Sequence, residues 1–250
     1  MDAFDFTLAG LQPLTLLDFP GRVAAVVFTQ GCQLRCPYCH NPQLIPCGQA
    51  PATNTTVPSS QPRTLAQLLA WLAQRQKVLS GVVFSGGEAT LQVGLPEALQ
   101  AVKAMGFATK LDTNGLQPNV LTALLAEGLL DYVALDVKAP PKKYATVVGL
   151  PAEASAGVAA KVEASMMALK ASGIAFECRT TVASPLLSDE DVMAIGHWVA
   201  GVPRYVLQAF RPVTSPLALA GAETLLPPAE GQLQRLQAQL APLVGGCLVR

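Results

Sequence analysis

The sequence has little net charge and no long block of charge of one sign. Seventeen Lys and Arg residues balance seventeen Asp and Glu residues, so the formal net charge at pH 7 is zero. Proteins that bind nucleic acid or an anionic membrane through a general positive field usually carry clustered Lys and Arg. We therefore expect neither nucleic acid nor a membrane among the partners of this chain.

Long apolar segments are also absent, although hydrophobic residues make up 51% of the chain. No uninterrupted apolar stretch approaches the roughly 20 residues that cross a bilayer. The chain starts with the acidic run MDAFDF, which lacks the basic and then apolar order of a secretory signal. Together with the need for reduced thiols described next, these absences predict a cytoplasmic protein.

Cysteine is scarce, and half of it is clustered. Six cysteines occur in 250 residues, and Cys32, Cys36 and Cys39 lie within eight positions. So few cysteines do not predict the disulfide framework of a small secreted domain. The C-x3-C-x2-C spacing instead lets one loop curl three thiolates toward a common point. Because no fourth cysteine completes the set nearby, a four-iron cluster held there would keep one iron open to a substrate or cofactor.

A zinc knuckle is the alternative reading of the cysteine loop, with His40 or Cys47 as a fourth ligand. Structural zinc usually takes its ligands as two separated pairs, and no second pair follows in this sequence. His40 is otherwise expected to support the loop by packing or by a hydrogen bond.

The remainder of the chain alternates apolar, β-branched runs with amphipathic stretches rich in Ala, Leu and Gln. This alternation is typical of β-α units around a parallel sheet. The predicted strands are 23–29, 82–85, 107–112, 132–137, 175–182 and 205–208. The predicted helices are 64–76, 96–105, 118–127, 158–172 and 189–200.

Six β-α units are too few for a complete eight-stranded barrel. We therefore predict an α/β fold of the TIM type, a partial (β/α)6 barrel with an open side. The whole chain, 1–250, is interpreted as a single domain with a core at about 16–212. A Pro/Thr/Ser/Gln-rich loop at 46–63 and a C-terminal extension at 213–250, with a further amphipathic helix, complete the chain.

Polar residues follow the predicted strands, at the end of a parallel barrel where active sites lie. Asp136 and Lys138 are two positions apart, so their side chains lie on the same face of a strand. For the same reason, Arg179 shares a face of its own strand with the residues two positions before and after it. An acid and an ammonium placed together suit a ligand with its own amine and carboxylate, or else form a plain ion pair at a sheet edge. The candidate cofactor-binding residues are Tyr38, Gly86, Gly87, Glu88, Asp112, Thr113, Asp136, Lys138, Arg179 and Gln208.

The cysteine loop, GCQLRCPYCHN, resembles the signature of the radical S-adenosylmethionine (SAM) enzymes, including the aromatic residue, Tyr38, before the last cysteine. The resemblance implies the radical SAM fold, with Cys32, Cys36 and Cys39 as catalytic ligands of a [4Fe-4S] cluster. In that superfamily SAM chelates the open iron, and one electron from the cluster splits SAM to a 5'-deoxyadenosyl radical.

Further motifs resemble those that hold SAM in this superfamily. Gly86-Gly87-Glu88 is similar to the GGE motif that receives the SAM amino group, with Ala89 where many relatives have proline. The D-x-K motif of Asp136 and Lys138 is implied to hold the methionyl end of SAM. Arg179, and less specifically Gln208, are implied to contact the ribose. Asp112, Thr113 and Asp136 also resemble a monovalent-cation site.

The resemblance narrows to the activating enzymes of glycyl-radical proteins, and among them to activators of anaerobic ribonucleoside-triphosphate reductase. The similar stretches include LLDFPG, SGGEATLQ, KLDTNG, YVALDVKAP and YVLQAFRP. The implied partners are a glycyl-radical protein and flavodoxin or another low-potential reductant. No further clustered cysteines are present for the extra clusters of dehydratase and decarboxylase activators.

Two other functions fit the same cysteine loop. One is a radical SAM enzyme that acts on a small molecule or a tRNA precursor, such as a deazapurine synthase, which needs a closed substrate pocket. The other is a binding module, an iron-sulfur or zinc scaffold without catalysis.

Overall fold

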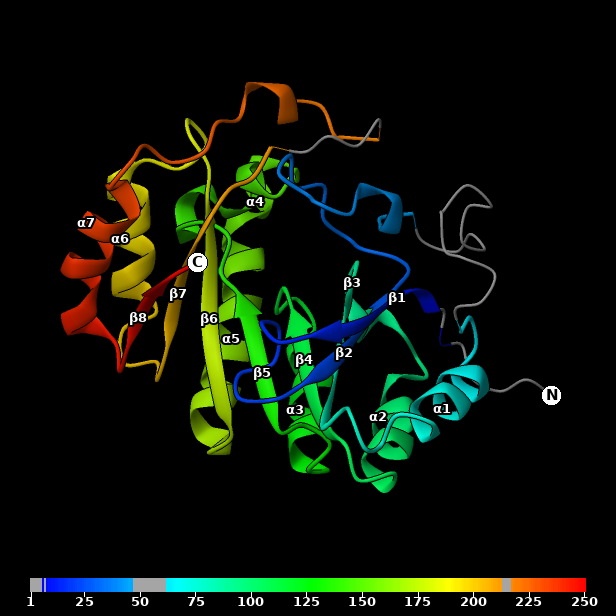
Figure 1. The fold of residues 1–250 in the computed structure, drawn as a ribbon. Coiled ribbons are helices and arrows are strands. Elements are labelled where there is room, and N and C mark those ends of the chain that lie inside the picture. The colour runs from blue at the N-terminus through cyan, green and yellow to red at the C-terminus, as the bar shows by residue number, and fades with distance from the viewer. Residues whose placement is uncertain (1–5, 7, 47–61, 213–216) are drawn as a thin grey trace. The chain divides into compact units, whose positions relative to one another are not determined.

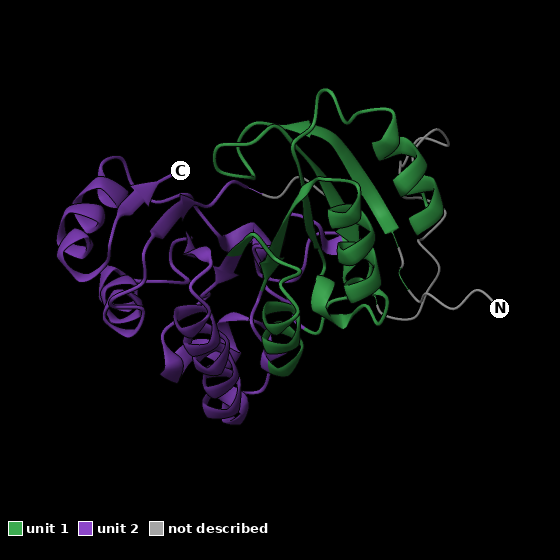
Figure 2. Ribbon diagram, turned by 90° about the horizontal axis from the view of Figure 1, so that it is seen from below, with its two compact units in different colours: residues 1–33, 43–113, 119–133 green, residues 34–42, 114–118, 134–250 purple. Residues whose placement is uncertain are grey.

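The computed structural model describes residues 6, 8–46, 62–212 and 217–250, and these fall into two compact units (Figure 2). Unit 1 is built from residues 1–33, 43–113 and 119–133, and unit 2 from residues 34–42, 114–118 and 134–250, within the described ranges. A single domain over 1–250 stays a prediction. Most of the predicted loop at 46–63, including Cys47, lies outside the described residues.

Among the described residues, eight strands form a sheet, and hydrogen-bonded neighbours in it follow the order of the chain (Figure 1). The strands are β1 (Leu8–Thr15), β2 (Ala24–Thr29), β3 (Gly81–Gly86), β4 (Ala108–Thr113), β5 (Tyr132–Asp136), β6 (Ala175–Val182), β7 (Tyr205–Ala209) and β8 (Cys247–Val249). In unit 1, β1 is antiparallel to β2, whereas β2, β3 and β4 are parallel. In unit 2, β6, β7 and β8 are parallel. The sheet begins at β1 and ends at β8, so it is not closed, and the predicted α/β fold of the open-barrel type is confirmed.

Seven α-helices occur in the described part of the chain. They are α1 (Leu65–Ala73), α2 (Leu95–Ala104), α3 (Pro118–Ala126), α4 (Tyr144–Val147), α5 (Ser155–Ser172), α6 (Asp189–Trp198) and α7 (Gln232–Leu240). Side chains fix two of their starts, because Thr64 accepts from the Gln67 N–H and Ser188 forms a capping box with Asp191. No helix among the described residues combines the length and apolarity that a membrane span requires.

All six predicted strands and the five helices predicted by range are present, within a few residues of their predicted limits, and the helix predicted in the C-terminal extension is α7. The two end strands, β1 and β8, are additional. β1 contains Gly10 and Pro13, which are unfavourable inside a sheet. They are acceptable here because β1 is an edge strand and pairs on one side only, so the N–H that proline lacks is not needed on the open side. β8 is only three residues long and follows two glycines, so it has no periodic pattern to recognise.

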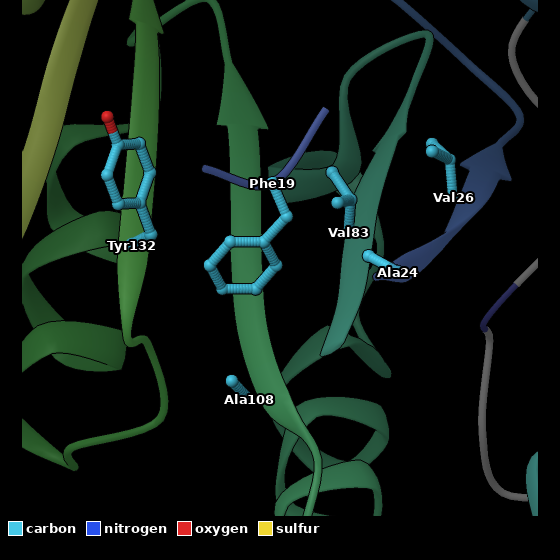
Figure 3. Packing of buried hydrophobic residues seen from close by; sticks show 6 residues of the cluster. All are labelled: Phe19, Ala24, Val26, Val83, Ala108 and Tyr132. Atoms are coloured by element: carbon cyan, nitrogen blue, oxygen red, sulfur yellow. The ribbon is translucent and has the colours of Figure 1, made fainter. Parts of the chain in front are cut away.

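The amino ends of the strands in unit 1 are sealed by an apolar cluster (Figure 3). Its buried members come from neighbouring strands and from the loop after β1, and they are Phe19, Ala24, Val26, Val83, Ala108 and Tyr132. The rings of Phe19 and Tyr132 lie 6.1 Å apart. Phe19 also covers Gly81, where an added Cβ would lie 2.8 Å from the ring. Apolar side chains therefore fill most of this end of unit 1.

The C-terminal segment is an integral part of unit 2. Helix α7 packs on α6 (Figure 1), where a Cβ on Gly196 would meet the Leu240 side chain at 1.9 Å. Beyond α7, β8 joins β7, and the following Arg250 approaches the fully buried Glu177 carboxylate at 3.4 Å. Arg204 lies 3.9 Å from the other oxygen of the same carboxylate. Residues after 217 thus complete the sheet of unit 2 rather than trailing from it.

Candidate active site

The loop that carries the cysteines is closed at its base by backbone hydrogen bonds in unit 1. The Gly31 N–H donates to the Leu44 carbonyl at 2.7 Å, and the Cys32 N–H donates to the Ile45 carbonyl at 3.1 Å. The Gln30 amide crosses the same base to the carbonyls of Gln43 and Pro46. The two ends of the loop are therefore pinned together at the carboxyl end of β2.

The Gly86-Gly87-Glu88 turn is attached to this base. Gly86 has a φ of 121°, a conformation that favours glycine, and a Cβ there would lie 2.2 Å from the Thr29 nitrogen. A Cβ on Gly87 would lie 2.1 Å from the Gly31 carbonyl oxygen. The Glu88 N–H donates to that same oxygen at 2.7 Å. The two glycines are therefore required for the turn to touch the residues immediately before Cys32.

Glu88 is buried, and its carboxylate is held by two threonines. Its Oε1 accepts from the Thr90 hydroxyl at 2.6 Å and from the Thr113 hydroxyl at 2.7 Å. The Thr90 N–H donates to the same oxygen at 3.2 Å. Two predicted site residues, Glu88 and Thr113, are thus in contact, and Thr90 is a supporting residue that the sequence did not reveal. Its position two residues after the motif carries no signal by itself.

Asp112 lies on the other face of β4 from Thr113 and has a buried lysine as its partner. The Lys110 ammonium forms an ion pair with Asp112 Oδ1, and Ser85 Oγ donates to Asp112 Oδ2 at 3.4 Å. Lys110 was not predicted as a site residue, because a lysine in a strand is ordinarily assigned to the solvent face. The alternation of side chains along β4 was the signal that could have found it, since Lys110 shares a face with Asp112.

In unit 2 the loop between Cys36 and Cys39 forms a tight turn, in which the Cys39 N–H donates to the Cys36 carbonyl at 3.0 Å. The turn is anchored at Arg35, whose N–H donates to the Val148 carbonyl at 2.9 Å. Gly149, with a φ of 73°, allows this approach, since a Cβ there would lie 2.5 Å from the Arg35 carbonyl oxygen. The chain after Lys138 therefore supports the cysteine turn.

Burial shapes the chemistry of the cysteine turn. It raises the pKa of the Cys36 and Cys39 thiols, while the positive charge of Lys138 acts in the opposite direction on both. Lys138 Nζ also lies 5.9 Å from the centre of the Tyr38 ring, close enough for a cation–π contact. Without a metal the two thiols stay protonated at neutral pH, so cluster binding must release their protons.

Asp136 lies between two cations in unit 2. Arg179 Nε donates to Asp136 Oδ1 at 2.8 Å, and Lys138 Nζ lies 3.3 Å from Oδ2. Burial alone would raise the pKa of Asp136, but the charges of Arg179 and Lys138 lower it to about 2. Burial alone would lower the pKa of Lys138, and Asp136 raises it well above its usual range. The three predicted residues thus form one charged group with a net positive charge at neutral pH.

Tyr144 fixes the backbone that carries this charged group. Its hydroxyl accepts from the Lys138 N–H at 3.1 Å and donates to the Asp136 carbonyl at 3.3 Å. The ring is fully buried and makes an edge contact with Trp198, with centroids 6.0 Å apart. Sequence reasoning missed Tyr144, because an isolated tyrosine eight residues after a strand residue has no motif to mark it.

The two remaining candidates differ in how they are placed. The exposed His40 ring stacks on Phe210 at 6.3 Å, and its Nε2 lies 3.2 Å from the Arg211 carbonyl oxygen. These contacts agree with the predicted supporting role. Gln208 is half-buried near the end of β7, in register with Thr181. Its predicted ribose contact stays a prediction.

The donor set fits a thiolate-held cluster with a zwitterionic ligand. The buried Cys36 thiol and the half-buried Cys39 thiol, both under the influence of the Lys138 ammonium, suit a cluster bound through sulfur. The Asp136 group offers both signs of charge, and the half-buried glycine turn immediately precedes the buried Glu88 carboxylate. Among the described residues, no three His, Cys, Asp or Glu side chains are grouped around a point that a single metal ion could occupy.

Comparison with known proteins identifies the family. The model of the radical SAM superfamily matches residues 26–199. A Methanocaldococcus jannaschii protein, named provisionally as a glycyl-radical enzyme activating enzyme, is 31% identical over 82% of this chain and 80% of its own length. The pyruvate formate-lyase-activating enzyme of Clostridium pasteurianum is 36% identical over 51% of this chain. That match spans 50% of the Clostridium enzyme, so it covers only about half of that relative.

Solved structures share the fold. SuiB of Streptococcus suis matches with a TM-score of 0.63 when bound to its precursor peptide and 0.59 when bound to S-adenosylmethionine. The identity is 13% and 14%, and this chain covers 48% of SuiB in each case, so the likeness concerns the fold alone. The family match and the Methanocaldococcus relative also identify the cofactors, which the likeness of fold alone does not. The protein uses a [4Fe-4S] cluster and SAM. The chain belongs to the radical SAM superfamily and is homologous to its glycyl-radical enzyme activating enzymes.

Proposed function

We propose that this protein is a radical SAM activase that generates a glycyl radical on a partner enzyme, most specifically on an anaerobic ribonucleoside-triphosphate reductase. The observation that carries the proposal is the match, over four-fifths of both chains, to the protein provisionally named as a glycyl-radical enzyme activating enzyme. The choice of the reductase rests on the motif resemblance in the sequence. We place the reaction in the cytoplasm, where thiolate ligands stay reduced and a flavodoxin or another low-potential donor can supply the electron.

We assign the three cysteines of the loop, Cys32, Cys36 and Cys39, as the cluster ligands. A reduced cluster bound there would supply the one electron that cleaves SAM to methionine and a 5'-deoxyadenosyl radical, and this radical would take a hydrogen atom from the partner's glycine Cα. The hydrogen leaves in 5'-deoxyadenosine, and the unpaired electron remains on the glycine. No side-chain base is needed, so the residues of this chain contribute position and charge.

The remaining predicted residues are assigned to SAM by their chemistry. Glu88, whose carboxylate is fixed by Thr90 and Thr113, suits the SAM amino group, and the half-buried backbone of Gly86 and Gly87 immediately precedes it. The further assigned contacts are Tyr38 and Lys138 for the methionyl end with Asp136 as counter-charge, and Arg179 and Gln208 for the ribose. Arg179 suits hydroxyl groups because its fork presents several donors in a fixed geometry.

The test of the activase function is a glycine-centred radical. We expect that the anaerobically reconstituted, reduced protein, mixed with SAM and an anaerobic ribonucleotide reductase, gives the glycyl signal in electron paramagnetic resonance. One 5'-deoxyadenosine should form for each spin. The control is the same reductase with its radical glycine replaced by alanine.

Each other outcome selects a different function. A radical on pyruvate formate-lyase but not on the reductase would keep the activase and change its partner. Cleavage of SAM with no radical on any glycyl protein would favour a small-molecule or tRNA-precursor enzyme. Intact SAM in the presence of a complete cluster would favour the scaffold.

The Tyr144 hydroxyl gives a second test, of the SAM assignment. Tyr144→Phe removes the bonds to the backbone of Lys138 and Asp136 and should cost about 1–3 kcal/mol of unfolding free energy. We also expect SAM affinity to fall about 10-fold or more, as when an outer-shell partner is lost. Urea unfolding and anaerobic equilibrium binding measure the two effects.

Tyr205→Phe is the matched control for this variant. Tyr205 is also fully buried, and its hydroxyl donates to Thr180 Oγ1 at 2.8 Å. Thr180 in turn donates to the Val137 carbonyl at 2.6 Å, so Tyr205→Phe leaves the hydrogen bond to the Asp136–Lys138 backbone in place. It should lose similar stability and keep its affinity for SAM. Equal loss of affinity in both variants would mean that Tyr144 acts on the fold alone.

A further inference from the structure

Lys110 is a buried ammonium in unit 1 that the assigned chemistry does not use. Its side chain is 1% exposed, and Nζ is paired with Asp112 Oδ1. On another side the ammonium lies 5.8 Å from the centre of the Tyr132 ring. Tyr132 belongs to the apolar cluster at the amino ends of the strands (Figure 3). The positive charge is therefore held between a carboxylate and an aromatic face.

The pairing of Lys110 with Asp112 is energetically required by their surroundings. Lys110 follows Ala108 of the apolar cluster on the same face of β4 and lies beside Val83 in the register of the sheet. A buried ammonium persists in such a place only if an opposite charge balances it. Asp112 supplies that charge, and the same contact neutralises Asp112. The carboxylate is thereby provided with a cation that belongs to the chain.

The family resemblance predicts a monovalent cation at Asp112, Thr113 and Asp136, and the side-chain contacts do not fit such an ion. In unit 1, Asp112 binds Lys110, and the Thr113 hydroxyl donates to Glu88 at 2.7 Å. In unit 2, Asp136 carries both Arg179 and Lys138. Each carboxylate of the predicted site already has a cationic side chain within its own unit.

We propose that the Lys110 ammonium takes the place of the predicted monovalent cation. A lysine ammonium is a compact point charge, similar in its charge and hydrogen bonding to a small hydrated cation. It cannot dissociate from the chain, so the charge at Asp112 is permanent. The consequence is that this protein binds SAM equally well with or without sodium and potassium. The proposal rests on the superfamily's SAM chemistry and does not depend on which glycyl protein is the partner.

The first experiment needs neither cluster nor SAM. Thermal unfolding of the full chain is compared in sodium, potassium and choline chloride at equal ionic strength. We expect the wild type to unfold at the same temperature in all three salts. In Lys110→Ala the carboxylate of Asp112 loses its cationic partner and keeps the Ser85 hydroxyl, and sodium or potassium should raise the midpoint by about 2 °C or more in a saturable way.

The double variant Lys110→Ala/Asp112→Asn is the matched control, because it removes both charges. It should respond to the three salts as the wild type does. If Lys110→Ala unfolds at the same temperature in all three salts, the proposal is overturned, since Asp112 would then not bind a cation when Lys110 is gone. If sodium or potassium also raises the unfolding midpoint of the double variant, the proposal is overturned too, because the ion would then bind at a site other than Asp112.

A second measurement on the wild type remains decisive if the lysine variants do not fold. SAM affinity of the anaerobic, cluster-loaded protein is measured in choline chloride and again with added potassium or sodium. We expect the dissociation constants to agree within about 2-fold. A 10-fold or larger gain on adding either ion would show that a separate cation site exists and would overturn the proposal. A failed glycyl-radical test leaves this binding result unaffected, so the two failures are distinguishable.

Discussion

Cys36→Ser is expected to abolish SAM cleavage. Cys36 is buried in the turn that Arg35 anchors to Val148, and it is one of three thiols assigned to the cluster. The loss of an outer-shell partner of a metal ligand typically costs 10- to 100-fold, and removal of a ligand itself must cost more, so we expect a decrease above about 100-fold. Iron and sulfide content after anaerobic reconstitution and the yield of 5'-deoxyadenosine measure the effect.

Cys247→Ser is the matched control for the cluster ligand. Cys247 is a half-buried cysteine on β8 and lies far along the chain from the loop. The variant should keep its iron, its sulfide and its SAM cleavage, because serine is nearly isosteric and no role in the cluster is assigned to Cys247. A Cys36→Ser protein with a full cluster and normal cleavage would show that the loop is not the cluster site.

The fold could be predicted from the sequence because its signals are local and repeated. β2 to β7 are short apolar runs separated by amphipathic helices, and each run buries at least one face. β1 and β8 could not be predicted in this way. β1 depends on pairing with β2 despite Gly10 and Pro13, and β8 depends on β7 and α7 to hold three residues in place. Tertiary contacts decide such segments.

The candidate site was predictable where residues repeat a known motif or share a face at a strand end. Asp136 and Lys138 are an example, since alternation along the chain after β5 predicts that they meet, and they lie 3.3 Å apart. The pairing of Arg179 with Asp136 joins residues 43 positions apart, which no local pattern specifies. The alternation of side chains along its strand predicts the face on which Arg179 lies, but it does not predict that Asp136 is its partner.

The supporting residues were not predictable, because their roles depend on packing. Tyr144 is identified only by the position of its hydroxyl between the backbone groups of Asp136 and Lys138. Lys110 contradicts the usual preference of lysine for solvent, and only its burial beside Asp112 and Tyr132 shows that it belongs to the interior. Deviations of this kind from local rules are expected at functional sites.

Gly87→Ala is expected to have the second large effect. A Cβ at this position would lie 2.1 Å from the Gly31 carbonyl oxygen and 2.9 Å from that of Leu44. Both are backbone atoms at the closed base of the cysteine loop, so neither can move without breaking the hydrogen bonds of that base. We expect a loss of about 3 kcal/mol or more in unfolding free energy, the upper range for an overpacked site. Cluster content should fall as well.

Gly157→Ala is the matched control, because the same glycine-to-alanine change is expected to raise stability there rather than lower it. Gly157 lies in α5, where an added Cβ meets no atom within 4 Å. Alanine is favoured over glycine inside a helix by about 0.5–1 kcal/mol, so this variant should be slightly more stable and should bind a full cluster. Urea unfolding of the cluster-free proteins measures the effect on the stability of the fold alone. Iron and sulfide analysis after reconstitution then measures how well the cysteine loop binds its cluster. A Gly87→Ala protein as stable and as iron-rich as Gly157→Ala would mean that the turn does not touch the base of the cysteine loop, and its assignment beside the cluster would be lost.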